Sequence, residues 1–246
     1  MTLPNGDDLP VDATVGPVNL LPHSLFTNIE VSLNGKQITE PTNYYQYRAY
    51  LETLINYSTT VLEKRMQIEG WRIDTAGSFA ITNAHEGANN GHRSRKEWIA
   101  RSRTAHFILH PRLDIFHQDS DIPPNTDIRI RLIPNRNPFY LMSNADIAYH
   151  LAITNIRFWI KTHEVTSSYL LNQQSLLHSN ISPRSFKIVM PSIRIKTLNI
   201  PIGTIRQEFD NLYMGALPHR IIFAMVQDSH MNGSYRTNPY FFNILV

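Results

Sequence analysis

The stretch LNGKQITEPTNYYQYRAYLETLINY, residues 33–57, contains the two strongest structural signals in the chain. Asn34-Gly35 predicts a tight hairpin, because both residues accept the positive φ angles of the turn. After Pro41, apolar side chains recur at helical spacing, which predicts an amphipathic helix over residues 44–57. This predicted helix is rich in tyrosine, at Tyr44, Tyr45, Tyr47, Tyr50 and Tyr57.

The tyrosines of this helix leave two interpretations open. A tyrosine side chain has one apolar end and one wet end, which suits a helix held between a sheet and a neighbouring chain. Amphipathic helices also commonly cover the core of their own fold. The sequence pattern is compatible with both.

Alternating apolar side chains predict half-buried strands on either side of the helix. Residues 26–33 and 127–133 follow the period of two that is typical of strands. Shorter apolar runs predict further strands at 107–109, 139–142, 149–160, 186–190, 192–200, 221–226 and 239–246. A shift of the period near Asn155 predicts a β-bulge. Residues 169–177 predict a short helix, and the polar stretch 83–97 predicts a long loop.

The composition favours an all-β chain of many short elements, because its 15 prolines mark frequent turns. Its 246 residues fit one large or two small domains. The chain has no cysteine, which excludes disulfides, thiol catalysis and cysteine-based zinc sites. It shows no long apolar run and no signal-peptide pattern after Met1, so we expect a soluble protein that is not secreted.

Three small groups of ionisable residues are candidates for a site: His106 with His110, His117 with Asp119 and Asp121, and Asp74 with His85 and Glu86. Two histidines do not make a metal site by themselves, because such a site needs several converging ligands. The second group indicates either an ion-binding loop or a polar turn before Pro123. The third has no nucleophile beside it. Hydrolase, metalloprotease and phosphate-loop motifs are missing from the sequence. We therefore expect no catalytic, cofactor-binding or metal-binding residues.

A short basic run occupies residues 92–96 and is followed by Arg101 and Arg103. One interpretation is a solvated loop, since a single basic run is weak evidence for nucleic-acid binding. The other is a contact with an acidic partner or with packaged DNA. The formal net charge of +3 is mild and decides neither.

Ordered motifs along the chain resemble one protein family. They are Val15-Gly16-Pro17-Val18-Asn19, His23-Ser24-Leu25-Phe26, Val31-Ser32-Leu33-Asn34-Gly35, residues 47–54, residues 113–119, residues 127–132, residues 139–142, residues 210–218, residues 232–235 and Asn238-Pro239-Tyr240-Phe241. In this order they resemble the major capsid proteins of Polinton/Maverick elements and adintoviruses. Each motif is weak by itself, whereas the ordered set covers most of the chain.

The resemblance implies an all-β fold of two jelly rolls in tandem, with short inserted helices. Family members have more chain before the Gly16-Pro17 motif and after the Asn238-Pro239 motif, so we expect both rolls to be incomplete. The first roll, without its early strands, is expected in residues 1–144. The N-terminal part of the second is expected in residues 145–246.

The resemblance also implies a function. The chain would be a structural virion protein, a hexon-like subunit whose pseudo-hexagonal homotrimers tile an icosahedral shell, encoded by a Polinton-like virus or endogenous element. Its partners would be copies of itself, a penton protein and minor capsid proteins, with non-specific contact to packaged DNA. It would be located in the virion after assembly inside the host cell, with no enzymatic activity, no cofactor and no membrane span.

An alternative is a ligand-binding, lectin-like β-sandwich, because jelly rolls host lectins as well as capsid proteins. Such a module needs a shallow aromatic site on one set of loops. Its aromatic candidates are Trp71, Trp98 and Trp159. A lectin would bind a sugar without assembling, whereas a capsid subunit would self-associate.

Overall fold

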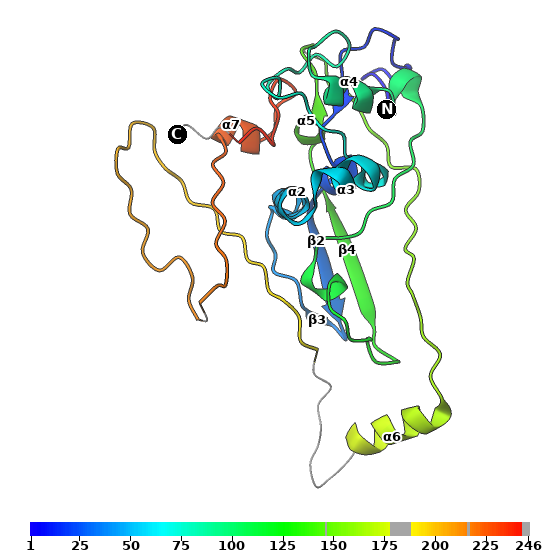
Figure 1. The fold of residues 1–246 in the computed structure, drawn as a ribbon. Coiled ribbons are helices and arrows are strands. Elements are labelled where there is room, and N and C mark those ends of the chain that lie inside the picture. The colour runs from blue at the N-terminus through cyan, green and yellow to red at the C-terminus, as the bar shows by residue number, and fades with distance from the viewer. Residues whose placement is uncertain (146, 178–187, 216, 243–246) are drawn as a thin grey trace.

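The computed structural model describes residues 1–145, 147–177, 188–215 and 217–242 (Figure 1). Strands within these residues form two small antiparallel sheets. The larger sheet has the order β3-β2-β4, made of β2 at Phe26–Leu33, β3 at Lys36–Gln37 and β4 at Ile128–Pro134. The smaller sheet pairs β1, Gly16–Pro17, with β5, Leu141–Met142.

Helices contribute more residues than strands. They are α1 at Leu21–Ser24, α2 at Tyr45–Asn56, α3 at Thr59–Lys64, α4 at Asn90–Lys96, α5 at Asn137–Tyr140, α6 at Ser167–Leu177 and α7 at Asp228–Met231. The described part of the chain also has three 3-10 turns: η1 at Met66–Glu69, η2 at Ala100–Ser102 and η3 at Asp114–Phe116.

The predicted hairpin is confirmed. Asn34 and Gly35 have φ angles of 49° and 79°, and they join β2 to β3. β2 also pairs with β4, with Val31 opposite Ile130. Because partners in register lie on the same face, the apolar residues of both strands share one face of the sheet. The polar residues share the other.

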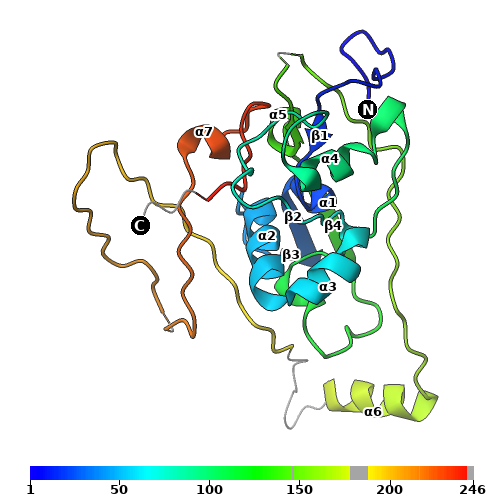
Figure 2. The same ribbon diagram turned by 45° about the horizontal axis from the view of Figure 1, so that its top comes forward.

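Helix α2 confirms the predicted helix and bridges two clusters of buried side chains. Tyr45 and Ala49 pack with the apolar face of the sheet. Tyr47 and Tyr50 pack with a second cluster that includes Tyr240. Tyr45, Tyr47 and Tyr50 therefore serve the core of their own chain. A contact of this helix with a neighbouring chain stays a prediction. Figure 2 shows α2 lying in front of β2.

The prediction of an all-β double jelly roll is wrong. A jelly roll needs two packed sheets with several strands in each, whereas the described residues hold one sheet of three strands and one of two. Residues 58–104, where the sequence pattern is ambiguous, fold as α3, η1, α4, η2 and loops. Helix α4 occupies the predicted loop 83–97.

Most of the predicted strands after residue 143 have no partner strand within the described residues. The runs 149–160, 192–200 and 221–226 are extended, and one isolated bridge joins His150 to Thr2. An alternating pattern shows that a strand could bury one face, but it does not supply the strand beside it. The predicted strands 186–190 and 239–246 lie partly outside the described residues. The domain boundary near Asn144 stays a prediction.

Two long segments leave the body on opposite sides (Figure 1 and Figure 2). One runs from residue 150 to α6, which confirms the short helix predicted at 169–177. The other spans residues 188–227 and returns to the body through α7 and Tyr240. The positions of these two segments decide which surfaces are open to other molecules.

Candidate functional site

Exposed apolar side chains gather on the two segments that leave the body. The first, the 151–165 segment, carries Ile153, Ile156, Phe158, Trp159, Ile160 and Val165. The second, the 188–225 segment, carries Val189, Ile193, Leu198, Ile200, Ile202, Ile205, Tyr213, Met214, Leu217, Ile221, Ile222, Phe223 and Met225. Trp159 is 90% exposed and Leu217 is 92% exposed. Apolar surface of this extent marks a site of protein or membrane interaction.

A groove of about 2200 Å³ lies between the 151–165 segment and the body. Its wall on the body side includes Ile128, Ile130 and Leu132 of β4. The same wall includes Phe26, Ile29, Val31 and Leu33 of β2. The apolar face of the sheet therefore lines the groove.

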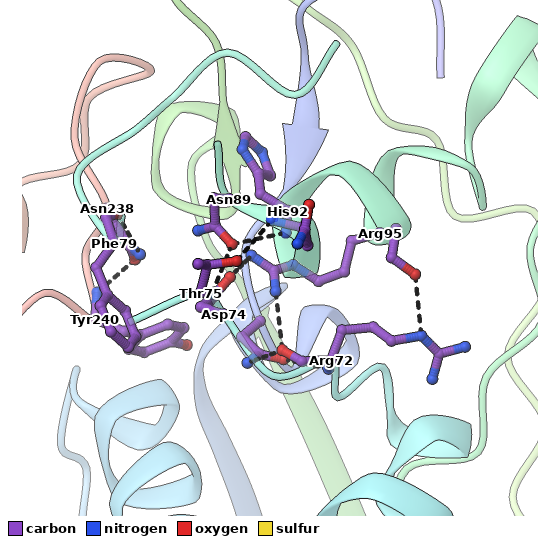
Figure 3. Close-up of polar contacts among 12 residues, drawn as sticks. Arg72, Asp74, Thr75, Phe79, Asn89, His92, Arg95, Asn238 and Tyr240 are labelled. Atoms are coloured by element: carbon purple, nitrogen blue, oxygen red, sulfur yellow. Dashed lines mark hydrogen bonds and ion pairs between the residues drawn. The ribbon is translucent and has the colours of Figure 1, made fainter. Parts of the chain in front are cut away.

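A buried polar cluster holds α4 against the body (Figure 3). Asn89 caps the helix, because its side-chain oxygen accepts hydrogen bonds from the backbone N–H groups of His92 and Thr75, each at 3.2 Å. The guanidinium of Arg95 forms an ion pair with Asp74 at 2.8 Å. Both side chains are closed to solvent, with exposed fractions of 0% and 3%.

The same cluster ties α4 to the strand β1. Arg95 donates hydrogen bonds to the carbonyl oxygens of Pro17 at 2.9 Å and Arg72 at 3.1 Å. The ring of His92 packs on Gly16, where an added Cβ would lie 2.7 Å from the His92 Nε2 atom, so a larger residue does not fit. Burial, followed by the charge of Arg95, lowers the pKa of His92 to about 4.

A second buried polar cluster joins α1, α2 and η1. His23 Nδ1 lies 2.9 Å from the Tyr45 hydroxyl oxygen, and His23 Nε2 lies 3.0 Å from Glu69 Oε2. Arg112 donates to the same Glu69 oxygen at 2.8 Å. Four segments that are distant in the sequence therefore meet at one carboxylate and one imidazole.

The charges of this second cluster follow from its burial. Burial lowers the pKa of His23 in spite of the opposing effect of Glu69. Burial alone would raise the pKa of Glu69, but the hydrogen bond and charge of His23, together with Arg112, hold it below its ordinary value. Glu69 is thus an ionised carboxylate at neutral pH, paired with Arg112 and hydrogen-bonded to His23.

The three groups of ionisable residues from the sequence do not converge on one centre. The ring of His110 meets that of His117 edge to face, with centroids 5.1 Å apart. Asp121 bonds to His163 instead, at 3.0 Å, and Asp74 belongs to the Arg95 ion pair. No group of three or more acidic or histidine side chains within the described residues is arranged to hold a metal ion.

The third group is separated by the fold. His85 lies 2.9 Å from Lys96 Nζ, whereas Glu86 is exposed. The basic run is divided as well, because its residues His92, Arg95 and Lys96 are buried. Arg93, Arg101 and Arg103 remain exposed. The prediction of a solvated basic loop is therefore wrong for three of the five residues of the run, which pack in the interior.

The three tryptophans occupy three different environments. Trp71 is buried beside Tyr50. Trp98 packs on Phe107 and lies beneath the guanidinium of Arg72. Trp159 projects from the 151–165 segment. They form no common aromatic site of the kind that the lectin-like alternative needs.

Sequence reasoning missed the two buried polar clusters. Their members are ordinary charged residues at scattered positions, such as Glu69 and Arg112, with no motif spacing. One signal was present, since Gly16 and Gly91 mark close approaches of the backbone to α4. Glycines at such positions predict packing, but they do not identify the partner.

An uncharacterized protein of Caenorhabditis elegans is 18% identical to this chain over 228 residues, which make up 92% of this chain and 51% of the worm protein. The chain thus spans about half the length of that relative. Neither a protein-family model nor a solved structure matches the present chain. Within the described residues, every helix is too short or too polar to cross a membrane.

Proposed function

We propose that this chain is a structural subunit that self-associates into a protein shell, as a capsid protein does. In this proposal the subunit forms a closed homotrimer, and the trimers meet one another, a penton protein and minor capsid proteins in a virion. The chain carries no catalytic role. Contact with packaged DNA is non-specific and electrostatic, through exposed arginines such as Arg101 and Arg103.

The observation that carries the proposal is the exposed apolar surface of the two segments. Trp159 at 90% and Leu217 at 92% exposure are large apolar side chains in full contact with water. Burial of apolar surface contributes a favourable free energy of about 25 cal/mol per Å². A partner that covers several of these side chains is therefore stabilised by several kcal/mol. The segments are therefore suited to lie against other chains.

Two further observations support the same function. The ordered motifs resemble those of the Polinton/Maverick and adintovirus capsid proteins along most of the chain. The charged fraction of 17% is low while tyrosine and phenylalanine are frequent, at 11 each. Interfaces are enriched in these aromatic residues and depleted of lysine and glutamate.

The mass of the purified chain in solution tests the proposal, by light scattering after size exclusion over a range of concentrations. We expect a discrete trimer of the 28.4 kDa chain. A mass that stays at one chain at all concentrations would contradict the proposal.

Matched variants identify the surface responsible. Trp159→Asp and Leu217→Asp each place a charge on an exposed apolar position, and we expect both to lower the assembled fraction. Thr162→Asp is the control, because it adds the same charge to a polar position of the 151–165 segment. If all three variants assemble like the unmodified chain, these segments do not form the interface.

A further inference from the structure

The outer edge of β4 is open within the described part of the chain. β4 is the last strand in the order β3-β2-β4, so half of its backbone N–H and C=O groups point away from β2. Ile130 on one face of this strand lines the groove. Arg129 and Arg131 on the other face have side chains that are 74% and 77% exposed. The edge thus presents alternating apolar and basic side chains.

The 151–165 segment of the same chain is a poor match for this edge. Arg157 and Lys161 alternate there with apolar residues. If Ile156, Phe158 and Ile160 faced the apolar side, these cations would share the face of the sheet that carries Arg129 and Arg131. Like charges on neighbouring strands are destabilising. The edge instead fits a strand with two acidic residues at a spacing of two.

Two pairs of acidic residues separated by a single residue lie well inside the described part of the chain, Asp119 with Asp121 and Glu208 with Asp210. The first encloses Ser120, which is a polar residue at the position that would face the apolar side of the edge. The second encloses Phe209, an apolar residue as the edge requires.

The backbone around the second pair is ready to form a strand. Residues 206–210 belong to no helix or strand and make no backbone–backbone hydrogen bond within the described residues, although the Glu208 carbonyl oxygen accepts a bond from the Gln207 side chain at 3.3 Å. Glu208 contacts Arg206, but this pair is exposed, with side chains 67% and 82% open to water. An exposed ion pair contributes little to stability, so Glu208 can readily pair with another cation instead.

We propose that residues 206–210 of a second copy add to the outer edge of β4 as an antiparallel strand. In the register that satisfies the charges, Glu208 lies opposite Arg131, Asp210 opposite Arg129 and Phe209 opposite Ile130 at the groove. This inference rests on the proposed self-association and names its surface. The contact joins two different patches, so it can close into a ring such as a trimer.

Charge reversal in two complementary variants tests the register. Arg129→Glu with Arg131→Glu reverses the acceptor edge, and Glu208→Arg with Asp210→Arg reverses the donor strand. Each variant by itself sets like charges opposite one another, and we expect the association constant to fall about tenfold. A chain that carries all four substitutions should restore association, because its acidic edge then meets the basic donor strand of the next copy around the ring.

Asp119→Arg with Asp121→Arg is the control, since it reverses an acidic pair of the same spacing, and we expect it to associate like the unmodified chain. Far-UV circular dichroism checks that each variant is folded. If the unmodified chain self-associates but the chain with all four substitutions fails to recover, or the two-substitution variants associate normally, the register is wrong while the shell function stands. An unmodified chain that stays monomeric overturns both.

Discussion

The rings of Tyr50 and Tyr240 stack face to face, with centroids 4.1 Å apart and planes 4° from parallel. Tyr50 belongs to α2, and Tyr240 lies near the end of the described chain. The Tyr240 hydroxyl oxygen also lies 2.6 Å from Ser24 Oγ. The stacked rings fasten the part of the chain that follows the 188–225 segment to α2, the helix that bridges both clusters of the core.

Tyr50→Ser should destabilise the folded chain by about 3–5 kcal/mol, because it removes a buried aromatic ring that stacks on Tyr240. Urea unfolding followed by circular dichroism measures the change. Tyr240→Phe is the control, because it keeps the ring and loses the hydroxyl contact with Ser24, at a cost of about 1 kcal/mol. Equal losses in the two variants would contradict a role for the stacked rings.

Two tyrosines of α2 should respond differently to loss of the hydroxyl group. The Tyr45 hydroxyl is bonded to His23 and accepts from the backbone N–H of Arg112 at 3.3 Å. Tyr45→Phe leaves these buried groups without a partner, at a cost of about 1–3 kcal/mol.

Tyr47 is the matched case, because its buried hydroxyl has no hydrogen-bond partner within the described residues. Tyr47→Phe removes an unsatisfied polar atom, so its unfolding free energy should be unchanged or higher. Thermal unfolding of both variants gives the comparison. A larger loss in Tyr47→Phe than in Tyr45→Phe would show that the hydrogen bonds do not set the difference.

Local signals in the sequence predict local structure well in this protein. Asn34-Gly35 predicts its hairpin because the turn depends on two residues alone. The helix over α2 follows from the spacing of its apolar side chains. Both features are decided by neighbouring residues, and both are confirmed.

Features that depend on distant residues are not predictable in this way. The run 221–226 has the composition of a buried strand, but strand pairing needs a second segment, and composition does not identify one. Arg95 reads as part of a basic loop until the fold brings Asp74 to it. The buried clusters and the open edge of β4 therefore required coordinates.

The Arg95–Asp74 ion pair provides a test of the buried cluster around α4. Asp74→Asn leaves the guanidinium buried without a counter-charge, so we expect a loss of about 3–5 kcal/mol. Combining it with Arg95→Met should cost less than the sum of the single changes, because no lone charge remains. Urea unfolding of the three variants gives the coupling free energy.

An exposed pair supplies the control for this cycle. Arg129 and Asp127 lie 3.0 Å apart with side chains 74% and 53% exposed. Arg129→Gln should change the unfolding free energy by no more than about 0.5 kcal/mol. A similar small effect of Asp74→Asn would mean that water reaches the Arg95 cluster.

Stability should fall as the pH falls from 7 to 5, because two buried histidines resist protonation. His92 has a pKa of about 4 in the folded chain against 6.5 in the unfolded one, and the pKa of His23 is lowered in the same direction. The unfolded chain therefore binds more protons in this window. The stabilisation is complete above pH 6.5 and is lost toward pH 4.

The contribution of His92 to the unfolding free energy falls by roughly 2 kcal/mol between pH 7 and pH 5. His92→Gln removes that titration, so its unfolding free energy should depend less steeply on pH, even if the variant is less stable at every pH. His23→Gln gives the matched test of the second cluster. The lowered pKa of Glu69 changes the stability only at pH values below its ordinary pKa of 4.5, which is outside the window from pH 7 to pH 5. An unchanged slope in His92→Gln, measured by urea unfolding at each pH, would show that His92 is already accessible to protons in the folded chain.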